Sequence, residues 1–180
     1  VVDENPTGPD AASAAFAAVL CYQQIYLEQH KGGSDRVGTG HLTGAAAAAT
    51  DAQSVAKRLA PKEITPAQKT MIGAFDRYAC YIQPPPAAER EARDQYIDIK
   101  FARARMYFEA QHWEEAAWAF REIALNYAED DAAPAAAQLY LEALNIMASS
   151  LSPAHPSCLD DMATDIPKLV QSFCTGGKEK

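Results

Sequence analysis

Apolar residues recur every three or four positions along most of this chain, a spacing that places side chains on one face of an α-helix. One such stripe, in the 65–83 segment, consists of Met71, Phe75, Tyr78 and Ile82. Thr65 before Pro66 predicts the start of this helix, because Thr is a good cap and Pro suits the first helical position. The prolines at 84–86 predict its end, since proline lacks a backbone donor and blocks a further turn.

Similar stripes predict further helices from about residue 10, over 45–59, 87–110 and 113–127, after Pro134, and over 157–174. Alanine is abundant and no segment shows the β-branched alternation of a strand, so we expect an all-α fold. We expect a single helical domain over 1–180. Its parts are a poorly ordered 1–9, N-terminal helices over 10–83, paired helices over 87–150, and a capping helix or hairpin over 157–175.

The segment 32–44 is rich in glycine and polar residues, and we predict a flexible loop there. Its GTGHLTG run superficially looks like a dinucleotide-binding fingerprint. No strand precedes it and the glycine spacing differs from that fingerprint, so we expect no bound cofactor.

Small and aromatic residues alternate in a distinctive order between 97 and 130. The positions that carry this pattern are Ala104, Tyr107, Trp113, Ala116 and Phe120. The order resembles the tetratricopeptide repeat, a helix-turn-helix unit of about 34 residues. In such a unit the small residues let two helix backbones approach, and the aromatic rings fill the space beside them. The resemblance implies a right-handed array of antiparallel helical hairpins.

Several positions depart from the pattern of that family. Arg103 stands where leucine is usual, Lys100 where tryptophan is usual, and Ala128 where a closing proline is usual. The 65–83 segment looks like the second helix of a preceding, degenerate repeat, but Phe75 precedes its counterpart Phe120 by 45 residues. An unrelated helical bundle with similar packing is therefore the alternative.

Tetratricopeptide arrays bind peptides or protein helices in a groove lined by their first helices. Carried over by position, the groove residues implied here are Asp98, Phe101, Arg105, Phe108, Glu109, Leu139 and Glu142. The alternative is that Phe101 and Phe108 pack against the 65–83 helix. Phe101 and Arg105 also occupy the positions where the family's clamp for C-terminal carboxylates has Lys and Asn, so that chaperone role is disfavoured.

The four cysteines are either buried free thiols or two disulfides. We favour the pairs Cys21–Cys80 and Cys158–Cys174. The second pair requires the chain to turn back near Pro167, because 16 residues span about 24 Å along a straight helix. Disulfides would place the protein in the bacterial periplasm or cell envelope, whereas free thiols would fit a cytoplasmic adaptor. No CxxC spacing supports a metal site.

The net charge, the length of the apolar runs and the placement of acidic residues argue against several classes of function. A net charge of −8 argues against nucleic acid binding, which needs Lys and Arg clusters. The longest apolar run, residues 11–21, is too short to span a membrane. Acid pairs such as Glu114–Glu115, Asp130–Asp131 and Asp160–Asp161 are adjacent in sequence, which suits helix starts better than a catalytic dyad. We therefore expect a non-catalytic scaffold or adaptor that binds other proteins as a component of a larger envelope or periplasmic assembly, without cofactor or metal. A cytoplasmic adaptor of the same fold with free thiols is the alternative, and an unrelated all-helical enzyme is the less favoured one.

Overall fold

The computed structural model describes residues 2–29 and 52–175, and these ranges contain helices and no strand. The helices are α1 (Ala11–Gln29), α3 (Ala52–Arg58), α4 (Pro66–Tyr81), α5 (Arg90–Glu109), α6 (Trp113–Asn126), α7 (Ala133–Ser149) and α8 (Cys158–Val170), which a π-helical turn, η1 (Gln171–Thr175), continues. The all-α prediction is confirmed for this part of the chain. The loop predicted at 32–44 and the first residues of the helix predicted over 45–59 lie outside the described residues.

The start of α4 follows the local chemistry of its first residues. The amide of Gln68 donates to Thr65 Oγ1 at 3.2 Å, and the amide of Thr65 donates to Gln68 Oε1 at 2.9 Å. This reciprocal capping box satisfies two backbone donors that the helix itself cannot, and Pro66 has no donor to satisfy. The predicted helix start is therefore confirmed.

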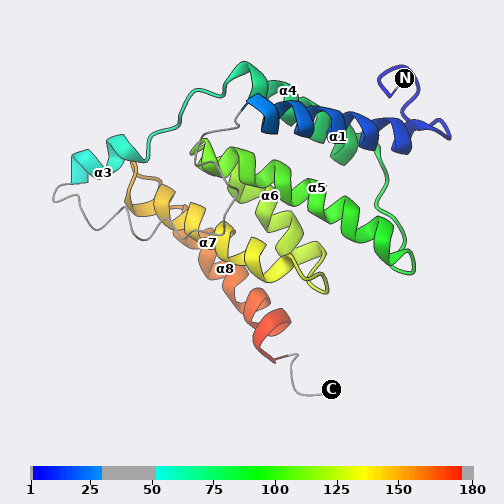
Figure 1. The fold of residues 1–180 in the computed structure, drawn as a ribbon. Coiled ribbons are helices and arrows are strands. Elements are labelled where there is room, and N and C mark those ends of the chain that lie inside the picture. The colour runs from blue at the N-terminus through cyan, green and yellow to red at the C-terminus, as the bar shows by residue number, and fades with distance from the viewer. Residues whose placement is uncertain (1, 30–51, 176–180) are drawn as a thin grey trace.

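Apart from α3, the α-helices are arranged as three neighbouring pairs (Figure 1). Helices α1 and α4 form the N-terminal pair, α5 and α6 the middle pair, and α7 and α8 the C-terminal pair. Helix α4 also packs on α5, and α6 packs extensively on α7, so each of these helices contacts the next in chain order. The buried hydrophobic core is consequently continuous from the N-terminal pair to the C-terminal pair.

The middle pair is closely packed because alanines lie in its seam. Ala104 of α5 and Ala116 of α6 have no exposed surface, and neither does Phe120. The ring of Phe120 meets Phe101 at 5.3 Å and Phe108 at 6.0 Å between centroids, both edge-on. Phenylalanines of α5 therefore fill the space beside the alanines.

Tyr107 does not have the role that the repeat resemblance implied. It is half-buried and lies against His112, at 6.4 Å between ring centroids, and beneath the guanidinium of Arg103. The register of the α5 helix places Phe101 and Phe108 toward Phe120 instead.

A ladder of aromatic rings connects the N-terminal pair to the middle pair. Its members are Phe16 of α1, Tyr78 of α4, Tyr96 of α5 and Tyr127 at the end of α6, with successive centroids 6.2, 5.9 and 6.3 Å apart. Burial raises the pKa of Tyr96 and of Tyr127, so both hydroxyls stay neutral. The ladder extends the core across four helices.

The turn between α5 and α6 holds a distant part of the backbone. Four hydrogen bonds join residues 110–113 to the connector 58–62: Gln111 Nε2 to Arg58 O (2.9 Å), Trp113 Nε1 to Leu59 O (2.8 Å), Lys62 N to Ala110 O (2.9 Å) and His112 Nε2 to Lys62 O (2.9 Å). Gln111 has a positive φ of 62°, a strained conformation for a residue with a side chain. Gln111 and His112 thus help to position the connector.

The N-terminal residues, expected to be poorly ordered, form turns over 2–10. The side chain of Val2 is buried in the core, and Asp3 pairs with Arg77 of α4 at 2.9 Å. Residues before α1 therefore add to the N-terminal pair.

The predicted turn near Pro167 is wrong, because α8 continues through Pro167 to Val170. Cys158 and Cys174 therefore lie at opposite ends of one helical segment, too far apart for a disulfide. All four cysteines are free: Cys158 is buried, and Cys21, Cys80 and Cys174 are exposed. Neither of the favoured disulfides is present.

Candidate functional site

A groove with a volume of about 700 Å³ lies between α6, α7 and the start of α8, and we call it the α6–α8 groove. Its buried apolar members are Trp113, Ala117, Leu144, Met147 and Cys158, which form its base. Half-buried Leu151 extends the base into the segment that connects α7 to α8. A base of this kind can receive an apolar side chain from another molecule.

Trp118 stands at the edge of this groove with 67% of its surface exposed. It also borders a second hollow, which lies on the outer face of α6 and includes Leu125 and Asn126. Exposed tryptophan is unusual on a protein surface, and tryptophan is among the residues that contribute most to protein interfaces. The position of Trp118 therefore marks the middle of α6 as a candidate contact surface.

The rim of the α6–α8 groove is acidic. Glu114 and Glu115 lie in the first turn of α6, Asp161 lies in the first turn of α8, and all three are exposed. The Nδ1 atom of His112 is 3.6 Å from a carboxylate oxygen of Glu115. This rim gives the groove a negative border.

Cys158 is a poor candidate for a catalytic nucleophile. Burial raises the pKa of its thiol, and the nearby carboxylates of Asp161 and Glu114 raise it further. A reactive cysteine needs a lowered pKa, because the thiolate is the nucleophile. The raised pKa therefore keeps the Cys158 thiol protonated and weakens it as a nucleophile.

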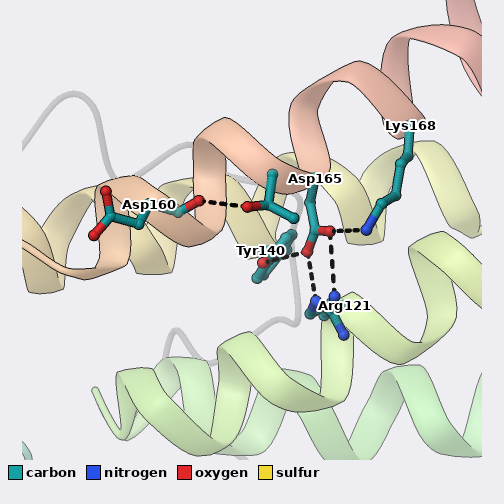
Figure 2. A network of polar contacts seen from close by, with 6 residues as sticks. Arg121, Tyr140, Asp160, Asp165 and Lys168 are labelled. Carbon is teal, nitrogen blue, oxygen red and sulfur yellow. Dashed lines mark hydrogen bonds and ion pairs between the residues drawn. The ribbon is translucent and has the colours of Figure 1, made fainter.

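A buried ionic network fixes α8 beside the groove (Figure 2). Only 1% of the Asp165 side chain is exposed, and it accepts hydrogen bonds from Tyr140 Oη at 2.9 Å and Lys168 Nζ at 2.7 Å. Arg121 of α6 donates two more. Burial opposes ionisation of Asp165, but the hydrogen bonds from Arg121, Lys168 and Tyr140 outweigh it and lower its pKa to about 2. The network therefore keeps a charged carboxylate between three helices.

Tyr140 has a different role in the same network. Burial raises the pKa of its hydroxyl, and the hydrogen bond to Asp165 raises it further. Its hydroxyl therefore remains a proton donor to the carboxylate at all physiological pH values. Because Tyr140 and Arg121 also line the α6–α8 groove, the network determines the shape of the groove wall.

The residues that the repeat resemblance placed in a groove are distributed over α5 and α7. Asp98 and Glu109 are exposed, Phe108 is buried, and the half-buried ones are Phe101, Arg105, Leu139 and Glu142. Phe101 and Phe108 contact Phe120, and Phe108 also contacts Trp113. These two phenylalanines thus contribute to packing, as the alternative expected, and their ring partners belong to α6. Arg105 pairs with Glu109 at 2.9 Å.

Asp98 borders another hollow, between α1, α4 and α5, with a volume of about 710 Å³. Burial raises the pKa of Asp98, and the carboxylates of Asp130 and Asp94 raise it further. Leu20, which is 49% exposed, lies on the same hollow. The predicted binding residue therefore belongs to a separate surface from the α6–α8 groove.

The sequence analysis did not single out Trp118. The available signal was its position, because Trp118 falls outside the apolar stripe that Trp113, Ala116, Ala117 and Phe120 define on the same helix. A large aromatic residue outside the core stripe of an amphipathic helix must face solvent or a partner.

Residues 2–29 and 52–175 contain neither a candidate metal site nor a candidate membrane-spanning helix. No group of His, Cys, Asp and Glu side chains there has an arrangement that could hold a metal ion. The helices of those ranges also include none with the length and apolar character needed to cross a bilayer.

Comparisons of the chain with models of protein families, with curated proteins and with solved structures found no match. The function is therefore proposed from the geometry of this chain.

Proposed function

We propose that this chain is a non-catalytic scaffold or adaptor that binds another protein. The observation that carries this proposal is Trp118, which exposes 67% of its surface in the middle of α6. It stands beside a groove of about 700 Å³. Burying a tryptophan of this exposure against a partner would remove a large apolar area from water, which is the main favourable term in association.

The composition of the α6–α8 groove also supports a protein partner. Its base is apolar and its border is charged, the arrangement of a protein interface with a dry core and a polar rim. The base includes Met147, whose flexible thioether adapts to side chains of different shapes.

We also propose that α5 and α6 form a tetratricopeptide-like unit within a right-handed array of helical hairpins. The seam of fully buried Ala104, Ala116 and Phe120 supports this interpretation, because it is the small-and-aromatic packing that the repeat uses. The chain-order packing of α4 through α8 supports it too, since repeat proteins form contacts mainly between neighbours.

The proposed location depends on the cysteines. A component of an envelope assembly would carry them paired, whereas a cytoplasmic adaptor of the same fold would carry them free. The four free thiols favour the adaptor of a reducing compartment.

An affinity experiment tests the proposed function. The immobilised full chain is incubated with native lysate of its source, and W118A and Y81A are treated in parallel. Tyr81 of α4 is a matched control because it is also an exposed aromatic residue, at 46%, and does not line the groove. We expect one protein to be retained in amounts comparable with the chain by the original sequence and by Y81A, and much less by W118A. Retention of no protein would contradict the proposal.

A further inference from the structure

We infer that the α6–α8 groove binds a basic amphipathic helix of a partner protein, with its apolar stripe on Trp118 and the groove base and its Lys or Arg side chains against the acidic rim. This inference rests on the proposed function, because it specifies the chemistry of the partner at the same groove. Three features of the groove carry it.

The first feature is the apolar base. Trp113, Leu144 and Met147 line the groove and are at most 8% exposed, so they belong to the packed core that forms its base. Trp118 rises beside them as a large exposed ring. An amphipathic helix presents apolar side chains at every third or fourth position, and such a stripe can cover the ring and reach the base together.

The second feature is the sign of the rim. The N-termini of α6 and α8 both open on this groove, and helix N-termini by themselves attract anions. Glu114, Glu115 and Asp161 occupy those two first turns, and their negative charges oppose the positive ends of the two helix dipoles. Within residues 2–29 and 52–175, Glu114 and Asp161 have no ion-pair partner. Their charges are therefore available to a cationic side chain.

The third feature is the pairing of Arg121, the arginine that lines the groove. The guanidinium of Arg121 donates two hydrogen bonds to the carboxylate of Asp165, so its positive charge is paired within the chain. Asp165, which Lys168 shares, neutralises part of this charge, so Arg121 offsets the negative rim less than an unpaired arginine would. The net charge of −8 on the whole chain has the same sign as the rim, and it would speed the approach of a basic partner at low salt.

Two designed peptides test this inference on the full chain. Both are amphipathic helices with leucine at every third or fourth position; one has lysine at the remaining positions and the other has glutamate. Trp113 and Trp118 are the two tryptophans of the chain, and Trp118 is the exposed one. We expect the lysine peptide to shift the tryptophan emission to shorter wavelength in a saturable way, and the glutamate peptide to leave it unchanged. W118F should remove the shift, because buried Trp113 is already out of water.

The charge requirement is tested with labelled lysine peptide and fluorescence anisotropy. We expect E114Q/E115Q/D161N to weaken binding at least about tenfold. The matched control E89Q/E91Q/D94N removes three carboxylates from the start of α5, away from the groove, and should change affinity less than about threefold. Circular dichroism of each variant confirms that the helices are intact, so a loss of binding is assigned to the removed charges.

Three outcomes would overturn the inference. They are absence of a shift with the lysine peptide, equal affinity for both peptides, and equal weakening by the two triple variants. If the affinity experiment retains a partner and neither W118A nor the groove triple variant reduces that retention, the inference fails while the proposed function stands. Absence of any retained protein, in contrast, overturns the proposed function itself.

Discussion

Arg121 of α6 donates to both carboxylate oxygens of Asp165 in α8, from Nε to Oδ2 at 2.5 Å and from Nη2 to Oδ1 at 3.2 Å. The two residues are 44 positions apart, so this contact is formed only by the folded chain. Bidentate contacts between arginine and a carboxylate restrict the orientation of the two side chains as well as their distance. The pair therefore sets the angle at which α8 crosses α6.

Replacing Asp165 by asparagine should destabilise the protein by roughly 2–3 kcal/mol, because Arg121, Lys168 and Tyr140 all lose a charged acceptor. The measurement is the free energy of unfolding in urea. Asp160→Asn on the same helix is the control, since the Asp160 side chain is exposed. A cost no larger than that of the control would contradict this assignment of the network.

The same carboxylate predicts a specific acid sensitivity. The pKa of Asp165 is lowered from 3.8 to about 2 in the folded protein, so its contribution to stability is complete above about pH 4. It is lost as the pH falls from the unfolded pKa through about 2, because over this range the unfolded chain takes up a proton that folded Asp165 does not. We expect the original chain to lose more stability than D165N between about pH 5 and about pH 2.5. Parallel losses in the two proteins would show that another carboxylate dominates.

Trp113 is expected to hold the connector 58–62 through its indole nitrogen. Trp113→Phe removes the 2.8 Å hydrogen bond to Leu59 O and part of a buried ring, which should cost roughly 1–2 kcal/mol. Hydrogen exchange of the Lys62 amide, which is bonded to Ala110 O, should become faster. Trp118→Phe serves as the control because Trp118 is exposed, and it should leave that amide protected.

Ala104 is predicted to control the distance between α5 and α6. Ala104→Leu adds a branched side chain at a position with no exposed surface, and it should destabilise the protein by roughly 1–3 kcal/mol. Ala135→Leu on the exposed face of α7 should change stability by less than about 0.5 kcal/mol. Thermal unfolding measures both. A tolerated Ala104→Leu would mean that the seam is looser than the repeat-like packing requires.

The thiols are predicted to react in two groups. Under non-reducing conditions the unfolded chain should titrate four thiols, and the native chain should react quickly at the exposed Cys21, Cys80 and Cys174 and slowly at buried Cys158. A chromogenic disulfide reagent measures both the number and the rates. Fewer than four thiols in the unfolded chain would reveal a disulfide and restore the envelope proposal.

Periodic features of the fold could be predicted from the sequence. Examples are the apolar stripe and N-cap of α4 and the buried alanines between α5 and α6. Each depends on the spacing of residues close together in the chain, which a single sequence shows directly. Pro167 misled the prediction because an internal proline usually ends or kinks a helix. In the structure α8 continues past Pro167, and Asp165, two residues earlier, is bonded to Arg121 of α6 and Tyr140 of α7. These partners are distant in the sequence, so the local pattern around Pro167 does not reveal them.

The candidate site could be predicted only in part. The repeat resemblance predicts binding residues on α5 and α7. The α6–α8 groove is formed instead by helices and a connector that approach one another only in the folded chain. Its base uses Leu144 and Met147, which look like ordinary core residues in the sequence. The rim residues Glu114 and Asp161 were interpreted as helix-start charges, and only the structure brings them to one border.

The bonds between residues 58–62 and 110–113 close a circuit of backbone that includes α4 and α5. Helix α4 cannot move away from α5 while that circuit is intact, even though α4 belongs to the terminal pair of helices. In an open chain of repeats, the end layer is normally the first to fray. Here the four hydrogen bonds around one tight turn couple α4 to the middle pair, so α4, α5 and α6 should unfold together as one cooperative unit.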